Sequence, residues 1–413
     1  MPQHAIRIDP ERLRTLLNGV NRFGFVPETG GYTRPGFTRV DLECRDWFEA
    51  QMRADDLQVW RDGALNLFGR YGPEDGPCVM AGSHLDTVVN GGAFDGALGA
   101  CVALECVRTM KDAGITPRTA IEVAATSEEE GRFGGMLGSQ AIAGAITPAW
   151  IEQAIDADGV RLRDAMNSLG LEPMDILKAA RPAGSINAFL ELHIEQGPVL
   201  EAEEFPIGIA EEVSGVCYLE LELTGIANHS GTTPMHLRAD AFAGLSELAG
   251  TIPDLIQMHG TDQSRFTIGH VELSPNHPHT IPGRAVFSVI LRDTSEEIMV
   301  GLKSRFLESA DIVANRHRLK LNKTERSWLS PVSLDSELAD KLAGLAERNE
   351  LPARRMPSGA GHDAQTMQSF CPSGLIFVPS RAGISHAPEE HSDWSDIEKG
   401  ANLMLQALLD LSG

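Results

Sequence analysis

Hydrophobic residues along the chain follow two spacings, one typical of helices and one typical of strands. Segments whose apolar residues recur every three to four positions predict amphipathic helices, and short apolar runs bounded by Gly, Pro or Asp predict strands. The predicted helices of this kind are 9–21, 39–54, a segment ending near 113, stretches of 148–180, 335–349 and 395–411. The predicted strands are 57–60, 65–69 (joined to the first at Asp62-Gly63 as a hairpin), 78–83, 119–126, 187–194 and 375–378. Strands that alternate with helices predict an α/β fold with a sheet flanked by helices.

The middle of the chain follows a different order of elements. From about Val213, strand patterns and helical patterns succeed one another as β-α-β-β-α-β, the order of a ferredoxin-like sandwich. These elements are the strands 216–224, 266–273, 285–292 and 319–324 and the helices 237–258 and 295–316. The α/β pattern resumes after this block. We therefore expect a discontinuous larger domain at 1–212 and 331–413, with an inserted domain at 213–330.

Composition and charge exclude several classes of partner. The chain has 413 residues, of which 42% are hydrophobic and 23% charged, as in ordinary globular proteins. Its 35 basic and 58 acidic residues give a formal charge of −23, which disfavours nucleic acids and anionic membrane surfaces as partners. The chain contains no run of about 18 apolar residues, so no membrane-spanning helix is predicted. The first residues lack the apolar segment of a signal peptide.

The cysteines indicate a reducing compartment. The six cysteines show no CxxC spacing, and several lie in apolar runs typical of a protein core. Cysteines of this kind stay reduced, so we expect a cytoplasmic protein.

The glycine-rich stretch 82–99 carries the first candidate chemistry. His84 and Asp86 follow a predicted buried strand, and Asp95 lies on the loop that leads into the next helix. Open α/β sheets build their sites at the carboxyl ends of strands. Imidazole and carboxylate groups are metal ligands, whereas the alternative interpretation is a polar loop with a chance histidine.

Two further predicted strands end in groups with the same chemistry. Residues Glu128, Glu129 and Glu130 follow the strand 119–126, and His193 lies near the end of the strand 187–194. Adjacent glutamates usually form a solvated surface. Because these strands are predicted to belong to one sheet, however, their ends converge and favour a metal site.

Six motifs resemble one known family. They are GSHLDTVVNGGAFDGALG, TSEEEGRF, ELHIEQGPVLE, NHSGTTPM, GAGHDA and GISHAPEE. Together they resemble the amidase/hydantoinase/carbamoylase branch of the M20 dinuclear metallohydrolases, which includes N-carbamoyl-L-amino-acid hydrolases, β-ureidopropionases and allantoate amidohydrolases. The motifs occur in order from residue 82 to residue 390, so the resemblance covers nearly the whole chain. HIEQGPVLE and GTTPM are specific to this branch.

The resemblance implies a centre of two divalent metal ions per subunit, bridged by Asp95. The implied ligands are His84 and His193 at one ion and Glu130 and His386 at the other. A nitrogen and oxygen donor set suits Zn²⁺, with Mn²⁺, Co²⁺ or Ni²⁺ as alternatives. Glu129 matches the general base of the family, and Asp86 matches the carboxylate that orients His84.

The resemblance also implies a set of substrate-binding residues. The positions that match those holding the ureido group and the carboxylate are Gln196, His229, Asn276 and Arg292. Gly359 and Gly361 would offer backbone N–H groups to the same carboxylate. One departure concerns Ile290, because relatives usually carry Asp two positions before the arginine that matches Arg292.

The implied fold and activity follow from the same resemblance. We expect an M20-type catalytic domain with a mixed sheet, an inserted ferredoxin-like α+β lid and dimerisation domain, and a homodimer formed through that lid. The expected reaction is metal-dependent hydrolysis of the C–N bond of an N-carbamoyl-L-amino acid or related ureido acid, with release of the amino acid, ammonia and CO₂.

Three alternative functions remain open at this point. The first is an allantoate amidohydrolase, which uses the same chemistry. The second is an M20 aminoacylase or dipeptidase, against which HIEQGPVLE and GTTPM speak. The third is a non-catalytic binding protein, which should have lost a ligand or the base, whereas the residues at all these positions are present.

Overall fold

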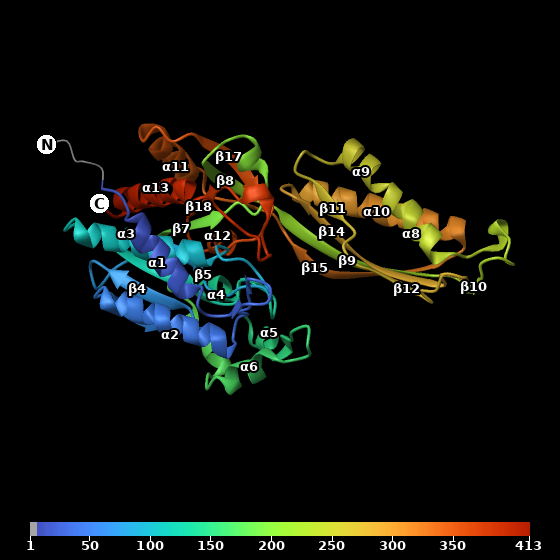
Figure 1. The fold of residues 1–413 in the computed structure, drawn as a ribbon, viewed down its shortest axis with the longest axis horizontal. Coiled ribbons are helices and arrows are strands. Elements are labelled where there is room, and N and C mark those ends of the chain that lie inside the picture. Colours follow the sequence, from blue (N-terminus) through green and yellow to red (C-terminus); the bar gives the residue numbers. More distant parts are fainter. Residues whose placement is uncertain (1–5) are drawn as a thin grey trace. The chain divides into compact units, whose positions relative to one another are not determined.

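The computed structural model describes residues 6–413 and divides into two compact units, shown in Figure 1. The large unit consists of the residues up to Glu211 together with Ser333–Gly413, and the small unit is Glu212–Val332. Each unit has its own apolar core. Within residues 6–413, no helix combines the length and the apolar character that crossing a lipid bilayer requires.

The large unit is built on a mixed sheet, as predicted. Its strands include β3 (Gln58–Arg61), β4 (Leu67–Tyr71), β5 (Cys78–His84), β6 (Ala120–Thr126), β7 (Ile186–Ile194), β8 (Ile207–Val213), β17 (Ala353–Ser358) and β18 (Ser373–Val378). They run in the order β8-β18-β7-β5-β6-β4-β3, and β17 also pairs with β8. Strands β18, β7, β5 and β6 are parallel, whereas β4 and β8 pair antiparallel with their neighbours. The parallel strands therefore end at one edge of the sheet.

One face of this sheet packs against long helices. The elements that share this core are α1 (Pro10–Val20), α2 (Arg39–Ala54), α3 (Ala97–Asp112), α11 (Ser336–Arg348) and α13 (Trp394–Ser412). Helix α3 is buried almost all round, because it packs between the sheet and helices α1 and α13.

The other face of the sheet carries the polar chemistry. Successive side chains of a strand point to opposite faces. In β7, Leu190 and Leu192 join the apolar core, which places Glu191 and His193 on the opposite face. The short helices α4 (Leu137–Ile142) and α12 (Asp363–Met367) pack against each other, and α12 also contacts β7 and β18.

The segment between β6 and β7 forms a helical layer. It contains α5 (Pro148–Gln153), α6 (Leu162–Ser168) and the 3₁₀ helix η1 (Pro173–Ala179), as the helical patterns in 148–180 predicted, together with α4, which was not predicted. Its apolar residues, among them Leu137, Ile151 and Ile176, form a separate cluster with Phe133.

The small unit has the predicted β-α-β-β-α-β order. It contains β9 (Gly215–Thr224), α8 (Ala241–Gly250), α9 (Ile252–His259), β11 (Arg265–Thr267), β12 (Val271–Ser274), β14 (Arg284–Asp293), α10 (Glu296–His317) and β15 (Lys320–Leu329). The antiparallel sheet has the order β11-β14-β9-β15, and β12 also pairs with β14. Burial alternates residue by residue along β9 and β14, so one face of the sheet forms the core.

Two local predictions differ from the structure, and a third is confirmed in outline. The helix predicted at 237–258 is two helices, because Pro253 starts a new first turn in α9. The strand predicted at 266–273 is divided into β11 and β12. The hairpin between β3 and β4 exists, but its loop is organised by the Asp62 carboxylate, which accepts hydrogen bonds from the N–H groups of Ala64 and Asn66. The left-handed residue of this loop is Leu65, at φ 66°.

Candidate metal centre

The candidate residues of the large unit lie at the carboxyl ends of neighbouring parallel strands. His84 is the last residue of β5, and its register partner Thr126 is the last residue of β6. The glutamates follow β6 directly, and His193 is the penultimate residue of β7, which pairs with β5 on its other side. The topology therefore brings the three predicted strand ends to one edge.

The first group of potential metal ligands consists of His84, Asp95 and His193. The Nε2 atoms of His84 and His193 lie 3.3 and 3.1 Å from Oδ1 of Asp95. All three side chains are buried, and each offers one ligand atom within 4.8 Å of the others.

The second group shares Asp95 with the first. Nε2 of His386 lies 3.3 Å from the other carboxylate oxygen of Asp95, Oδ2, and 3.4 Å from Oε2 of Glu130. Asp95 therefore directs one oxygen to each group. This is the arrangement that a carboxylate bridging two cations needs.

Both buried histidines are held in the tautomer that ligates through Nε2. Nδ1 of His84 lies 3.0 Å from the backbone carbonyl of Asp86, and Nδ1 of His193 lies 2.9 Å from the carbonyl of Ile194. A carbonyl oxygen only accepts, so each Nδ1 carries a proton, and the neutral form of each ring has its lone pair on Nε2.

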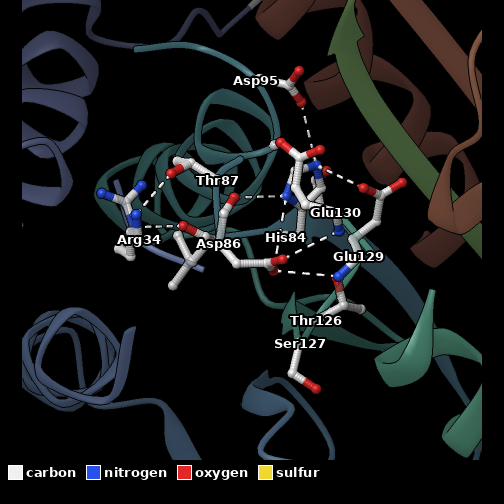
Figure 2. A network of polar contacts seen from close by, with 12 residues as sticks. Arg34, His84, Asp86, Thr87, Asp95, Thr126, Ser127, Glu129 and Glu130 are labelled. Carbon is white, nitrogen blue, oxygen red and sulfur yellow. Dashed lines mark hydrogen bonds and ion pairs between the residues drawn. The ribbon is translucent and has the colours of Figure 1, made fainter. Parts of the chain in front are cut away.

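The carboxylate of Asp86 orients the glutamate turn more than it orients His84. Its Oδ1 is 3.9 Å from Nδ1 of His84, beyond hydrogen-bond distance. Its two oxygens instead accept the backbone N–H groups of Glu129 at 3.4 Å and Glu130 at 3.2 Å, as Figure 2 shows. The contact with His84 is made by the Asp86 carbonyl.

Glu129 lies beside the first group without belonging to it. Its carboxylate points toward the imidazole of His84 (Figure 2), with Oε2 at 3.6 Å from Nε2, and its side chain is 9% exposed. Burial raises the pKa of Glu129 well above its ordinary value, and the neighbouring charge of Glu130 adds to the effect. A carboxylate that favours the protonated state at the edge of a ligand group is suited to accept and return a proton.

The electrostatics of the cluster favour bound positive charge. Burial raises the pKa of Glu130 to about 7, with a further contribution from Asp95. The hydrogen bond to Asp95 raises the pKa of His386 to about 9. Burial works against protonation of His84, but the carboxylates of Glu129, Asp95 and Asp86 together outweigh it and raise the imidazole pKa. Carboxylates packed this closely need a compensating cation.

Two residues outside the predicted set position Asp95. Oε1 of Glu390 accepts the backbone N–H groups of Phe94 at 2.8 Å and Asp95 at 3.0 Å. Ser385 lies with its hydroxyl 2.8 Å from Oε2 of Glu390 and 3.1 Å from Oδ2 of Asp95. The sequence signal for Glu390 was its place in GISHAPEE, but nothing local distinguishes it from exposed Glu389.

A further buried polar group, formed by Glu191 and His362, lies next to His193. Glu191, His193 and His362 also lie within ligand distance of one another. Both oxygens of Glu191 already accept hydrogen bonds, from the Ser83 hydroxyl at 2.6 Å and the Ala364 N–H at 2.8 Å. The ring of His362 packs edge-on against His193. These contacts make the group a polar support rather than a third cation site.

The predicted substrate-binding residues fall into both units. In the large unit, the side-chain amide of Gln196 donates to Oδ2 of Asp95 at 2.7 Å and lies 3.3 Å from Nε2 of His386. Gly359 and Gly361 lie in the turn between β17 and α12. The structure therefore brings Gln196 together with the ligand groups.

The remaining three predicted residues lie in the small unit. His229 ends β10 (Asn228–His229), whose register partner is β13 (Thr280–Ile281). Asn276 is on the turn between β12 and β13. Arg292 lies on β14, opposite Val216 of β9, and burial lowers its pKa. Ile290 lies two positions earlier on β14 and thus on the same face as Arg292.

The residues present fit one or two divalent cations. The donor set contains only imidazole nitrogens and carboxylate oxygens, which suits Zn²⁺ and its neighbours in the first transition row. The backbone also fits closely around the site, because a Cβ on Gly96 would meet the ring of His84 at 2.3 Å.

Comparisons with known proteins identify the family to which the chain is similar. The model of peptidase family M20/M25/M40 matches residues 80–410. The chain is 37% identical over 402 residues to an N-carbamoyl-L-amino-acid amidohydrolase of Paenarthrobacter aurescens, covering 96% of this chain and 97% of that protein. It is 34% identical to an allantoate amidohydrolase of Escherichia coli, with 97% and 98% covered. The crystal structure of an amidase of the hydantoinase/carbamoylase family from Burkholderia multivorans superposes with a TM-score of 0.90 at 31% identity, over 98% of both chains.

Proposed function

The chain belongs to peptidase family M20/M25/M40, and we propose that it hydrolyses the C–N bond of an N-carbamoyl-L-amino acid or related ureido acid. The reaction consumes water and releases the amino acid, ammonia and CO₂. The enzyme is a metal-dependent amidohydrolase. The observation that carries the proposal is the division of the two Asp95 oxygens between two ligand groups, with Glu129 beside them.

In this proposal the two groups hold two divalent ions, Zn²⁺ in the first instance. His84 and His193 would bind one ion, Glu130 and His386 the other, and Asp95 both. Bound divalent ions supply Lewis acidity at the scissile carbonyl and acidify the attacking water. The protonated Nδ1 atoms of His84 and His193 support this role, since they leave Nε2 to the metal.

Glu129 acts as the general base and then as the general acid. Its carboxylate takes a proton from the attacking water and returns it to the leaving nitrogen, so that the C–N bond breaks without expelling an amide anion. Its raised pKa supports the second half of this cycle, because a weakly acidic carboxyl group holds the proton until the nitrogen accepts it. Asp86 fixes the backbone of Glu129 and Glu130 during both steps.

Substrate binding is assigned to residues of both units. Gln196 is assigned to the ureido group, and its Oε1 is buried without a hydrogen-bond partner within residues 6–413, which leaves an acceptor for a ureido N–H. Arg292 and Asn276 are assigned to the carboxylate, together with His229 and the N–H groups near Gly359 and Gly361. A guanidinium grips a carboxylate through two parallel hydrogen bonds.

Allantoate is the second candidate substrate. Relatives named allantoate amidohydrolases from Escherichia coli and Bacillus subtilis are 34% and 31% identical to this chain. Allantoate carries two ureido arms on one carbon, so its enzyme needs a polar pocket for the arm that is not cleaved. The same metal centre serves either substrate.

The proposal extends to assembly and location. Residues 1–212 and 331–413 would form the catalytic domain, and 213–330 a lid through which two chains form a homodimer. Strand β15 supports this role, because in the small unit it is an edge strand that pairs with β9 alone. All six cysteines are buried free thiols, which supports a cytoplasmic protein.

A substrate panel on metal-reconstituted protein tests the proposal. The protein is stripped with a chelator, reloaded with Zn²⁺, Mn²⁺, Co²⁺ or Ni²⁺, and assayed by ammonia release with N-carbamoyl-L-amino acids, 3-ureidopropionate, allantoate and dipeptides. We expect turnover of ureido acids only, and only with metal. Hydrolysis of dipeptides in preference to every ureido acid would contradict the proposal.

A further inference from the structure

A hollow on the large unit adjoins Glu130, one of the proposed metal ligands. Its volume is about 280 Å³, and it is formed by the loops at 35–36, 87–89, 130–132 and 156–158. Val88, on its wall, donates its backbone N–H to Oε1 of Glu130 at 3.3 Å, while the other oxygen of that carboxylate faces His386. The hollow therefore begins on the far side of a carboxylate that belongs to the metal centre.

The wall of the hollow is apolar where it meets the metal centre. Pro35, Val88 and Val89 line it, and the side chain of Val89 is 72% exposed at its rim. A single exposed valine is ordinary. Three apolar residues around a concave surface beside a metal centre are the usual composition of a ligand pocket.

Three polar side chains of the hollow, those of Arg132, Asp156 and Thr87, are already hydrogen-bonded within the protein. Arg132 donates from Nε to Asp156 at 3.1 Å and from Nη1 to the carbonyl of Gly36 at 2.9 Å. Asp156 also accepts the N–H groups of Asp158 and Val160. The hydroxyl of Thr87 donates to the carbonyl of Val88 at 2.9 Å. A polar group entering here would have to break these bonds, whereas an apolar group would not.

We propose that this hollow binds the α-side chain of the substrate and selects neutral, apolar side chains of intermediate size. The inference rests on the proposed function. In an N-carbamoyl amino acid the side chain begins two bonds, about 2.5 Å, from the ureido nitrogen that is attached to the α-carbon, so a substrate whose ureido group is held beside Glu130 can place its side chain past this carboxylate. A volume of 280 Å³ is just below the range of about 300–1,000 Å³ for pockets that enclose whole drug-sized ligands, which suits one side chain.

The charges of the hollow define what it rejects. Arg132 is neutralised by Asp156, and the carboxylate of Asp158 lies on the rim. An aspartate or glutamate side chain of the substrate would meet Asp158 without a free cation to pair with. The carbonyl of the second ureido arm of allantoate would have to compete with Asp156 and Gly36 for the Nε and Nη1 donors of Arg132. The hollow thus favours N-carbamoyl derivatives of residues such as methionine and leucine over both.

Narrowing the hollow tests the proposal. Val89→Phe adds a ring at the rim without touching a metal ligand, and Val160→Phe makes the same change at a valine that is 38% exposed and does not line the hollow. We expect Val89→Phe to lower the ratio of kcat/KM for N-carbamoyl-L-methionine over N-carbamoylglycine about tenfold or more, the usual effect of one misfitted apolar group. Val160→Phe should leave this ratio unchanged.

Reversing the charge of Asp158 at the rim of the hollow gives a second, independent test of the proposal. Asp158→Lys should raise kcat/KM for N-carbamoyl-L-aspartate relative to N-carbamoyl-L-methionine, and Asp164→Lys, an exposed aspartate on α6 outside the hollow, should not. Calorimetric titration in a Glu129→Gln background gives the same comparison as dissociation constants, independent of turnover.

The possible results distinguish a failure of the proposed side-chain pocket from a failure of the proposed enzymatic activity. If Val89→Phe changed both substrates by the same factor, or if Asp164→Lys matched Asp158→Lys, the hollow would not bind the side chain. Wild-type preference for allantoate over N-carbamoyl-L-methionine would also overturn the inference while leaving an amidohydrolase in place. Absence of turnover with every ureido acid would instead refute the proposed function.

Discussion

Residue 96 lies directly against the imidazole of His84: a Cβ there would come within 2.3 Å of the ring atoms Nδ1 and Cε1. Gly96 also has φ 60°, which non-glycine residues rarely adopt. We therefore expect Gly96→Ala to displace His84 and to lower bound metal sharply. Gly114→Ala is the matched control. Gly96 directly precedes helix α3 and Gly114 lies just after its end, but Gly114 has nothing within 4 Å of its Cβ position, and its φ is 67°. The control should lose about 1 kcal/mol of stability from backbone strain alone and keep its metal. Metal content by mass spectrometry and thermal unfolding distinguish the two effects.

Glu129 and His193 are expected to fail in different ways. Glu129→Gln keeps the shape of the side chain but removes its ability to take a proton, so kcat should fall about 100-fold or more with near-normal metal content. His193→Ala removes a ligand and should lower metal content together with activity. His270→Ala, at a histidine whose side chain is 62% exposed, is the control and should change neither. Full activity of Glu129→Gln would show that another group is the base.

Glu390 is expected to control metal affinity without being a ligand. Glu390→Ala leaves the N–H groups of Phe94 and Asp95 without their acceptor, so Asp95 loses its fixed direction. We expect metal affinity to fall about 10- to 100-fold, as is typical when a partner of a ligand is removed. Glu390→Gln, which can still present an oxygen to both N–H groups, should recover part of the loss.

The neighbouring Glu389 provides the control for this experiment. It is exposed, so Glu389→Ala should leave the dissociation constant, measured by competition with a chelator, unchanged. Equal effects of the two alanine variants would refute the positioning role of Glu390.

Asp62 is expected to make stability depend on pH. Burial raises its pKa from 3.8 to about 6, although the hydrogen bonds from Asn66 and Ala64 oppose this. The raised pKa means that the folded state holds the proton more tightly. The resulting stabilisation is fully present below pH 3.8 and is lost as the pH rises through 6. The stability of wild type relative to Asp62→Asn should therefore fall by roughly 1 kcal/mol between about pH 5 and 8.

Chemical unfolding at saturating metal across this range measures the effect. The control is Asp56→Asn, which removes the same charge from a side chain that is 92% exposed. The stability of this variant should depend on pH in the same way as that of wild type. A wild-type curve parallel to that of Asp62→Asn would mean that Asp62 is ionised at no cost in the folded protein.

His229 is expected to act across the proposed dimer. The resemblance of NHSGTTPM to the family motif implies that its histidine, His229, reaches the active site of the partner in the proposed dimer. Glu129→Gln and His229→Ala chains, each inactive alone, should then regain part of the activity when co-expressed. One site of each hybrid dimer would carry both substitutions and the other neither. Proven hybrid dimers without activity above that of the parents would assign His229 to its own subunit or to none.

Local sequence patterns were sufficient for most of the long helices and central strands, and for the edge of the sheet at which the candidate metal ligands lie. Buried strands such as 78–83 and 187–194 can be predicted from their continuous apolar runs. Polar residues directly after such strands lie at the carboxyl edge of a parallel sheet. The places of His84, Glu130 and His193 at strand ends could be predicted for this reason, whereas their roles as ligands were implied only by the family resemblance. The breaks at Pro253 and after β11 were missed, because a helix boundary or a split strand depends on a few kcal/mol of local backbone preference that the apolar periodicity does not reveal.

What the sequence by itself determined is therefore the class of fold and the chemistry of the ligand groups, since both depend on neighbours along the chain. Only the tertiary structure decided how Asp95 divides its oxygens, why residue 96 is glycine and which of two adjacent glutamates supports the site. Glu390 is 295 residues away from Asp95 along the chain, and their hydrogen bond exists because β18 and β5 both pair with β7. Contacts of this kind arise from packing between distant segments, and no local periodicity encodes them.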